Sequence, residues 1–321
     1  MTARFDIAAL GELLIDFTDR GLSDAGMRLF EQNPGGAPAN MLAAAARLGE
    51  RTAFIGKVGD DMHGRFLRDT LTAAGIDVTG LVLSPDVFTT LAFVALDDRG
   101  ERHFSFARKP GADTCLRSDE LPAPLLSSAR VLHVGSLSLT DEPARSATYA
   151  AVEYCREHGK LISFDPNLRK PLWRDLEEAK KQMLWGLQHA DVVKISDEEV
   201  EFLFGLDVQA GAAHILKEFG VKLVFVTCGP EGCWFDNGTA RGMTPSLRDI
   251  KVLDTTGAGD IFGGSAMWKL LQTGKVPGDL TEADLRDITA FACTSAGLST
   301  TRPGGISSVP EYEEVLTRMG K

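Results

Sequence analysis

Short apolar runs alternate along the chain with longer stretches of helical periodicity. The apolar runs are rich in β-branched residues and predict buried strands at 6–11, 52–58, 130–136, 160–166, 190–196 and 222–229. The stretches between them end in glycine and predict helices at 38–49, 141–159, 197–205 and 210–220. Because strands and helices alternate, we expect a doubly wound α/β fold with a mostly parallel sheet and helices on both faces.

Two stretches, 13–36 and 87–111, interrupt this rhythm and read as strand pairs, the second with its turn at 97–101. Such pairs can be surface hairpins, or they can form a small separate β-sheet that covers an active site as a lid. We favour the lid. We expect a single domain over residues 1–321, with the lid formed by insertions at about 13–35 and 87–110.

The net charge of −11 narrows the classes of partner. Nucleic-acid binding needs a basic surface, so we expect no nucleic-acid partner, and anionic membranes are disfavoured for the same reason. No apolar run is long enough to span a bilayer, and the N-terminal residues do not resemble a signal peptide. The five cysteines are scattered and predict neither a disulfide framework nor a zinc site. We therefore expect a cytoplasmic protein.

The stretch "DTTGAGD" at 254–260 directly precedes a predicted helix at 261–274. A dinucleotide fingerprint would need glycine at Phe262, and no Walker A loop is present in the sequence. The remaining chemical interpretation is an anion cradle, in which amides at a helix start hold phosphate oxygens and Asp260 accepts a proton from a hydroxyl. The alternative is that Asp260 only stabilises the helix N-terminus.

Two signatures resemble those of the ribokinase-like (PfkB) sugar kinases. One is "DTTGAGDIFGGS", and the other is "GGAPAN" at 35–40 followed by "RLG" and "IGKVGDDMHG". Further segments, "GELLIDF", "FDPNLRKPLW" and "KISDEEVEFLFG" among them, resemble the fructokinase branch, although 2-keto-3-deoxygluconate kinases share "DPNLR…LW". The resemblance implies ATP-dependent phosphorylation of a sugar hydroxyl with Mg²⁺ and often K⁺, on a doubly wound α/β body with a β lid.

The resemblance also assigns roles to residues. The general base is Asp260, and the anion hole is Gly257, Ala258 and Gly259. The expected sugar contacts are Asp16, Gly36 and Asn40, supported by Asp165 and Asn167. The positive groups expected to meet substrate or phosphate are Arg108 and Arg169, because a guanidinium fork suits phosphate oxygens.

Nucleotide contacts are expected at Lys194, Ser196, Thr227, Gly229, Gly232 and Cys293, with Ser196 in a position where the family commonly has Asn. Glu199 is expected to organise Mg²⁺ through water. A monovalent-cation site is expected at Asp254, Thr256, Ser299, Arg302, Gly304 and Ser308.

Three functions follow, in order of preference. The first is a kinase for fructose, and the second is a kinase for a keto-deoxy sugar acid, which needs a positive group facing the carboxylate. The third is a sugar or nucleotide sensor without catalysis, which the intact "GAGD" disfavours. The expected partners are a sugar and ATP, with a homodimer formed through the lid, since an exposed sheet needs cover for its edges.

Overall fold

The computed structural model describes residues 4–96 and 102–321, so the predicted turn at 97–101 lies outside it. Within the described residues, nine strands form one sheet in the order β13-β12-β11-β10-β9-β8-β1-β4-β5. Their bounds are Phe5–Leu10 (β1), Thr52–Gly59 (β4), Ile76–Ser84 (β5), Ala129–Gly135 (β8), Leu161–Asp165 (β9), Val192–Ser196 (β10), Leu223–Thr227 (β11), Cys233–Asp236 (β12) and Arg241–Thr244 (β13). Only β12 and β13 run antiparallel to their neighbours, so the predicted mostly parallel sheet is confirmed.

Strand β1 lies where the strand order reverses. From β1 the sheet is extended in one direction by β4 and β5, and in the other by β8, β9, β10 and β11. Ligands of open α/β sheets bind at the carboxyl ends of the strands beside such a reversal. The topology therefore places the expected site above the ends of β1, β8, β9 and β10.

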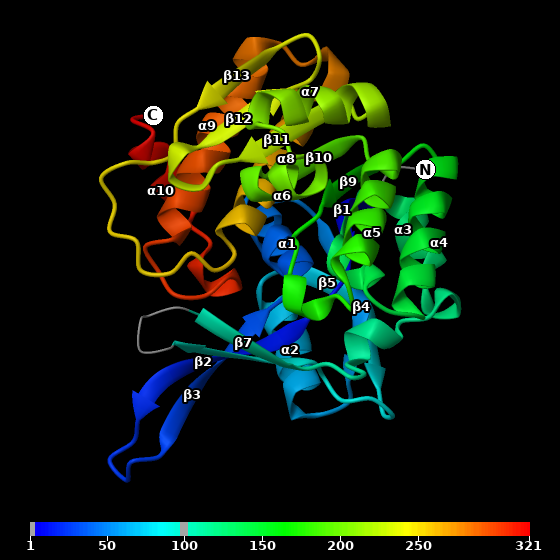
Figure 1. The fold of residues 1–321 in the computed structure, drawn as a ribbon, viewed down its shortest axis with the longest axis vertical. Helices are drawn as coiled ribbons and strands as arrows, with labels where there is room; N and C mark the ends of the chain where they lie inside the picture. The colour runs from blue at the N-terminus through cyan, green and yellow to red at the C-terminus, as the bar shows by residue number, and fades with distance from the viewer. Residues whose placement is uncertain (1–3, 97–101) are drawn as a thin grey trace.

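Helices cover both faces of the sheet (Figure 1). Their bounds are Ala37–Arg47 (α1), Met62–Ala73 (α2), Ala123–Ser128 (α3), Ala144–Glu157 (α4), Leu176–His189 (α5), Asp197–Phe204 (α6), Val208–Phe219 (α7), Ala258–Thr273 (α8), Glu282–Ser299 (α9) and Tyr312–Arg318 (α10). All the predicted helices are confirmed, but α8 begins at Ala258 and not at residue 261. Asp260 therefore lies inside the first turn of this helix.

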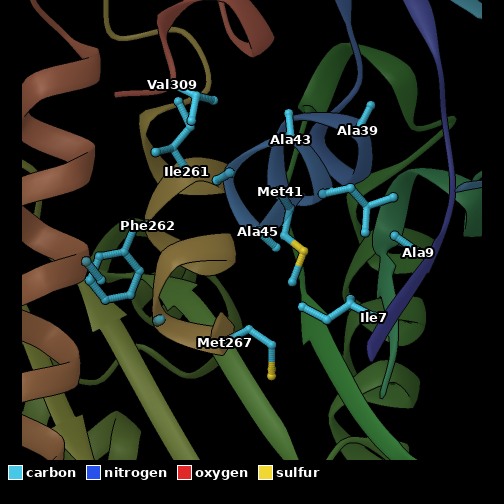
Figure 2. Close-up of a cluster of buried hydrophobic side chains, with 14 of the residues drawn as sticks. Ile7, Ala9, Ala39, Met41, Ala43, Ala45, Ile261, Phe262, Met267 and Val309 are labelled. Carbon is cyan, nitrogen blue, oxygen red and sulfur yellow. The ribbon is translucent and has the colours of Figure 1, made fainter. Parts of the chain in front are cut away.

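Side chains that alternate along β1 build two apolar cores, one on each face of the sheet. Ile7 and Ala9 pack with α1, α8 and α9, as Figure 2 shows around Met41 and Phe262. Ala8 and Leu10 pack in the second core with residues of α4, α5 and α7. Helices α1 and α8, which carry the two resemblance signatures, thus share one core and are held side by side.

A second sheet has the order β3-β2-β6-β7 and lies at the bottom of Figure 1. Its strands are Leu14–Leu22 (β2), Arg28–Gly35 (β3), Leu91–Leu96 (β6) and Arg102–Ala107 (β7). The two interrupting stretches therefore come together in one small sheet, as predicted. Strand β3 ends directly before Gly36, which begins α1.

None of the helices in the described parts of the chain combines the length and the apolar content that crossing a bilayer requires.

Candidate active site

The start of α8 is a turn that only small residues can form. Gly257 is the N-cap residue with φ 74°, and a Cβ there would lie 3.0 Å from Gly305 Cα and 3.1 Å from Asn40 Nδ2. The amides of Gly259 and Asp260 are in the first turn, where an α-helix supplies no carbonyl partner. The amide of Ala258 donates to the Thr255 carbonyl at 3.3 Å. Together with the helix dipole, the free amides favour an anion.

Asp260 is 9% exposed and lies beside these amides. Its Oδ2 accepts a hydrogen bond from Asn40 Nδ2 at 2.9 Å. Burial raises the pKa of Asp260 to about 6, with a further rise from Asp165 and opposing effects from Lys194, Asn40 and Arg169. At pH 7 the carboxyl is mostly ionised, and its pKa is close enough to neutral pH for it to accept and release a proton.

Lys194 and Asp165 form a buried ion pair on the neighbouring strands β10 and β9. Nζ and Oδ2 are 2.9 Å apart, and the side chains are 13% and 6% exposed. Burial alone would lower the pKa of Lys194, but the carboxylates of Asp165, Glu199 and Asp260 offset this effect and the pKa is raised. A Cβ on Gly259 would lie 2.9 Å from Lys194 Nζ. The ammonium group therefore lies against the back of the anion-binding turn.

Beneath this group lies a cavity of about 20 Å³, lined by residues that include Asp165, Lys194, Asp260, His133 and Ser163. It has room for about one water molecule. Burial, with a smaller contribution from Lys194, lowers the pKa of His133 to about 3, and its Nδ1 lies 3.0 Å from Ser163 Oγ. His133 is therefore neutral at pH 7 and adds no charge beneath the site.

Three of the predicted sugar and phosphate contacts face the same region. Burial raises the pKa of Asp16 to about 6, and Arg169, Asp254 and Asp260 are near enough to act on its charge. Arg169 is exposed at the end of the loop that follows β9 and also acts on Asp260. Gly36 has φ 128°, and a Cβ there would overlap the carbonyl of Glu12. Gly36 is buried, and its missing side chain lets the start of α1 pack closely against Glu12, between Asp16 and Asn40. Its contact with the sugar stays a prediction.

The loop after β9 is held by Glu199. Its Oε1 accepts from the Leu168 amide at 2.6 Å, and its Oε2 accepts from the Ser196 amide at 2.8 Å. Ser196 Oγ accepts in turn from the Glu199 amide, which makes a capping box at the start of α6. Asn167 has φ 44°, a backbone conformation that Asn tolerates better than most residues. Glu199 thereby fixes the loop that carries Asp165 and Arg169.

The predicted nucleotide turn lies one strand further along the sheet. Ser196 and Thr227 are paired in register at the ends of β10 and β11. Gly229 and Gly232 have φ 52° and 118°, and the Cys228 amide closes the turn by donating to the Gly232 carbonyl at 2.8 Å. Cys293 on α9 is 5% exposed and packs in the apolar core. Burial and, less strongly, the nearby Cys228 of this turn raise the pKa of its thiol, and its contact with the nucleotide stays a prediction.

The predicted cation loop is assembled from two distant segments. Asp254 Oδ2 accepts from the Gly304 amide at 2.9 Å, and Oδ1 accepts from the amide and hydroxyl of Thr256. The amides of Leu253 and Asp254 donate to the Thr300 carbonyl. The other predicted residues, whose side chains bond to neighbouring groups, are Ser299, Arg302 and Ser308. The region offers mainly oxygen atoms as possible metal ligands, and a hard cation prefers such ligands.

Arg108 is the clearest difference from the sequence analysis. Its side chain is 4% exposed and pairs with Asp113 at 2.7 Å. It also donates to Thr140 Oγ1 and to the Leu137 carbonyl, both at 2.9 Å. Asp113 accepts as well from Thr90, the residue that precedes β6. Because its donors are used within the protein, Arg108 anchors the base of the small sheet, and we do not include it among the substrate contacts.

Glu12 is a residue that the sequence analysis missed. It is 3% exposed, its Oε1 accepts from the Ala37 amide at 2.9 Å, and burial raises its pKa to about 7. It therefore fixes the start of α1 beside Gly36. A signal was available, since Glu12 is an acid within two residues of the end of a buried strand.

The comparisons with known proteins agree with this geometry. A sequence profile described as pfkB family carbohydrate kinase matches residues 4–312. A probable fructokinase-4 of Arabidopsis thaliana is 44% identical over 312 residues, which cover 96% of this chain and 95% of the relative. A crystal structure of fructokinase with bound ATP from Xylella fastidiosa has 35% identity and a TM-score of 0.87, with 98% of each chain covered.

A second solved structure is a fructokinase double mutant from Vibrio cholerae O395 in a fructose, ADP and potassium ion bound form. It is 32% identical to this chain, with a TM-score of 0.86 and 99% of each chain covered. The profile match spans nearly the whole chain, and these relatives are similar over almost their full lengths. The chain therefore belongs to the pfkB family of carbohydrate kinases.

Proposed function

We propose that this protein is an ATP-dependent fructokinase that transfers the γ-phosphate of ATP to a hydroxyl of fructose. The observation that carries the proposal is the buried Asp260 next to the free amides at the start of α8, with Asn40 and Lys194 against it. A sensor would have no need of the base. The similarity to fructokinases over nearly the whole chain supports the choice of sugar.

In the proposed mechanism, Asp260 takes the proton of the attacking hydroxyl. The sugar oxygen then forms a bond to the γ-phosphorus, and the bond from that phosphorus to the β-γ bridging oxygen breaks, which releases ADP. The amides of Gly259 and Asp260 and the ammonium group of Lys194 stabilise the negative charge on the transferring group. The small sheet would exclude water as a lid, which strengthens these interactions.

The contacts of Arg108 favour a neutral sugar over a sugar acid. A substrate carboxylate would need a guanidinium or ammonium group with free donors. Arg108 uses its donors on Asp113, Thr140 and Leu137. Arg169 is exposed, and the carboxylates of Asp16 and Asp260 are near enough to interact with its charge and would repel a substrate carboxylate. We therefore rank the kinase for a keto-deoxy sugar acid second.

The residues present fit the expected ions. The described residues contain no group of three His, Cys, Asp or Glu side chains that could hold a metal, and Mg²⁺ in kinases is held largely by phosphates and water. Glu199 accepts two amide hydrogen bonds and keeps further acceptor sites for a metal-bound water. When bound, Mg²⁺ supplies positive charge at the phosphates. The loop of Asp254, Thr256 and Gly304 would hold K⁺, next to the anion-binding turn.

The test is an ATP-consumption assay of the purified protein against a panel of neutral sugars and keto-deoxy sugar acids. We expect fructose to be phosphorylated with the highest kcat/KM of the panel. Turnover of a sugar acid with no turnover of fructose would favour the second function. Thermal stabilisation by one sugar with no ATP consumption on any of them would indicate the sensor.

Replacement of Asp16 by alanine tests the proposed sugar site. We expect the KM for fructose to rise about ten- to a hundredfold, since a hydrogen bond to a charged group is worth about 1.5–3 kcal/mol. The KM for ATP should change far less, because Asp16 faces Arg169 and Asp260 and not the β11 turn. Steady-state kinetics with each substrate varied in turn measures both values. Equal rises in the two KM values would contradict a specific sugar contact.

Two further expectations stay predictions. The β2–β3 hairpin exposes Leu22, Met27, Leu29 and Phe30 at 64%, 68%, 46% and 40%, and a second copy of the chain would cover them. This exposure supports the predicted homodimer through the small sheet. The cytoplasmic location rests on the sequence analysis alone.

A further inference from the structure

The side-chain amide of Asn40 is enclosed by three segments that are distant in the sequence. It lies in the first turn of α1, is 4% exposed, and donates from Nδ2 to Asp260 Oδ2 at 2.9 Å. A Cβ on Gly305 would overlap Asn40 Oδ1, and a Cβ on Gly257 would lie 3.1 Å from Nδ2. Two glycines therefore make room for this amide, and the packing leaves it little freedom to turn away from the carboxylate.

We propose that Asn40 is a positioning residue for the general base. Its Nδ2 group holds Oδ2 of Asp260, which leaves Oδ1 of Asp260 as the oxygen that receives the proton of the sugar hydroxyl. This inference rests on the proposed phosphotransfer and deepens it. It differs from the sequence-based expectation for Asn40, which was a sugar contact.

The orientation of the Asn40 side-chain amide leaves its oxygen without a partner in the described part of the chain. Asn40 Oδ1 is buried and has no hydrogen-bond partner within the residues that the structure describes. An orphan acceptor costs free energy, yet the reverse orientation would place this oxygen against a carboxylate, which can only accept. The bond to Asp260 therefore decides how the amide is oriented. A sugar hydroxyl that donates to Oδ1 of Asn40 would be compatible with the same orientation.

Several charges face Asp260 from other elements. Asp165 raises the pKa of Asp260, whereas Lys194 and Arg169 lower it. The charge of Asp260 in turn raises the pKa of Asp16 on β2. Asn40 is the neutral member of this group, and its hydrogen bond also lowers the pKa of Asp260. Loss of the Asn40 donor should therefore raise the pKa of the base, so that a smaller fraction of the enzyme is active at neutral pH.

The experiment is the pH dependence of kcat/KM for fructose in the wild type, Asn40→Ala and Asn40→Asp. The wild type should lose activity on the acid side near pH 6, where both Asp260 and Asp16 titrate. In both variants we expect the Asp260 part of this acid limb to move up by roughly one to two pH units, and kcat/KM at pH 7 to fall about two- to tenfold. An unmoved acid limb with only a raised fructose KM would overturn the proposal and leave Asn40 as a sugar contact.

Asn237→Ala is the matched control. Asn237 is also a buried asparagine, 7% exposed, and its Nδ2 donates to the Leu280 carbonyl at 2.9 Å. It follows β12 at the edge of the sheet opposite the carboxyl ends of the parallel strands. This variant should lose stability without any movement of the acid limb. If Asn40→Ala does not fold, Asn40→Ser, whose hydroxyl is too short to reach Asp260, is expected to move the limb in the same way. A wild type that phosphorylates no sugar would refute the proposed function itself, whereas an active wild type with unmoved limbs in the variants refutes only this inference.

Discussion

Asp260→Asn should abolish most turnover while the protein keeps its fold. The substitution preserves the shape of the side chain and removes its ability to accept a proton, and loss of a general base typically lowers rates about 10²–10⁴-fold. Asp260 is 9% exposed and faces Asn40 and Lys194, so the amide fits the same space. We expect kcat to fall by this factor in a fructose-dependent ATP-consumption assay, with the fructose affinity changed little.

The stability of this variant can be predicted from the pKa of Asp260. The folded state raises the pKa to about 6. The carboxyl therefore contributes stability below its unfolded pKa and loses that contribution as the pH rises through 6. At pH 7 the asparagine removes the cost of a buried charge, so the melting temperature should not fall appreciably.

Asp284→Asn is the control, since Asp284 occupies the same third position of the first turn in α9, and its side chain is 22% exposed. It should keep kcat and lose a little stability through its cap. Near-normal turnover in Asp260→Asn would remove the central element of the proposed mechanism.

Lys194→Met should cost both stability and rate. The substitution leaves Asp165 as a buried charge without its partner, and breaking a buried ion pair from one side typically costs about 3–5 kcal/mol of unfolding free energy. It also removes the positive charge that lies against Gly259. The transferring phosphoryl group would be bound at the amides of this turn, so its negative charge would be stabilised less. We expect kcat to fall at least about tenfold, measured where the variant is fully folded.

Lys57→Met separates these two effects. Lys57 and Glu120 form another buried pair, with Nζ and Oε1 2.7 Å apart and side chains 9% and 20% exposed. This pair packs near Cys115 and is not part of the active site. The control should therefore lose stability, as unfolding in urea measures, and keep its kcat. If Lys194→Met behaved in the same way as Lys57→Met, Lys194 would be a structural residue only.

The sequence predicted the parallel sheet well because its strands are buried on both faces and read as continuous apolar runs. It missed β5, β12 and β13 at the two ends of the sheet. Strand β5 mixes buried, half-buried and exposed positions without a two-residue alternation, and β12 and β13 are only four residues long, so none of the three gives a strong pattern. The long helix α9 was missed because small polar residues such as Thr294 and Ser295 interrupt its apolar face.

The candidate site was predicted unevenly for a physical reason. Motif residues such as Asp260 and Asn40 can be recognised from their spacing, but their hydrogen bond joins positions 220 residues apart and becomes visible only in the folded chain. Arg108 was predicted to meet substrate or phosphate because of its residue type. Its acceptor Asp113 follows five residues later, but no recognisable motif in the sequence joins the two. Whether a charged side chain faces a ligand depends on whether it is buried against an oppositely charged partner. A single sequence does not show which charged residues are buried together.

The direct connection from β3 into α1 limits how this protein can be altered. Strand β3 ends at Gly35, Gly36 caps the helix, and Asn40 follows within the first turn. One added or deleted residue between Pro34 and Asn40 would rotate the helix by about 100° relative to the strand or shift it along its axis. Loop-length variation, domain insertion and circular permutation should therefore be tolerated at the far tip of the β2–β3 hairpin and not at its base.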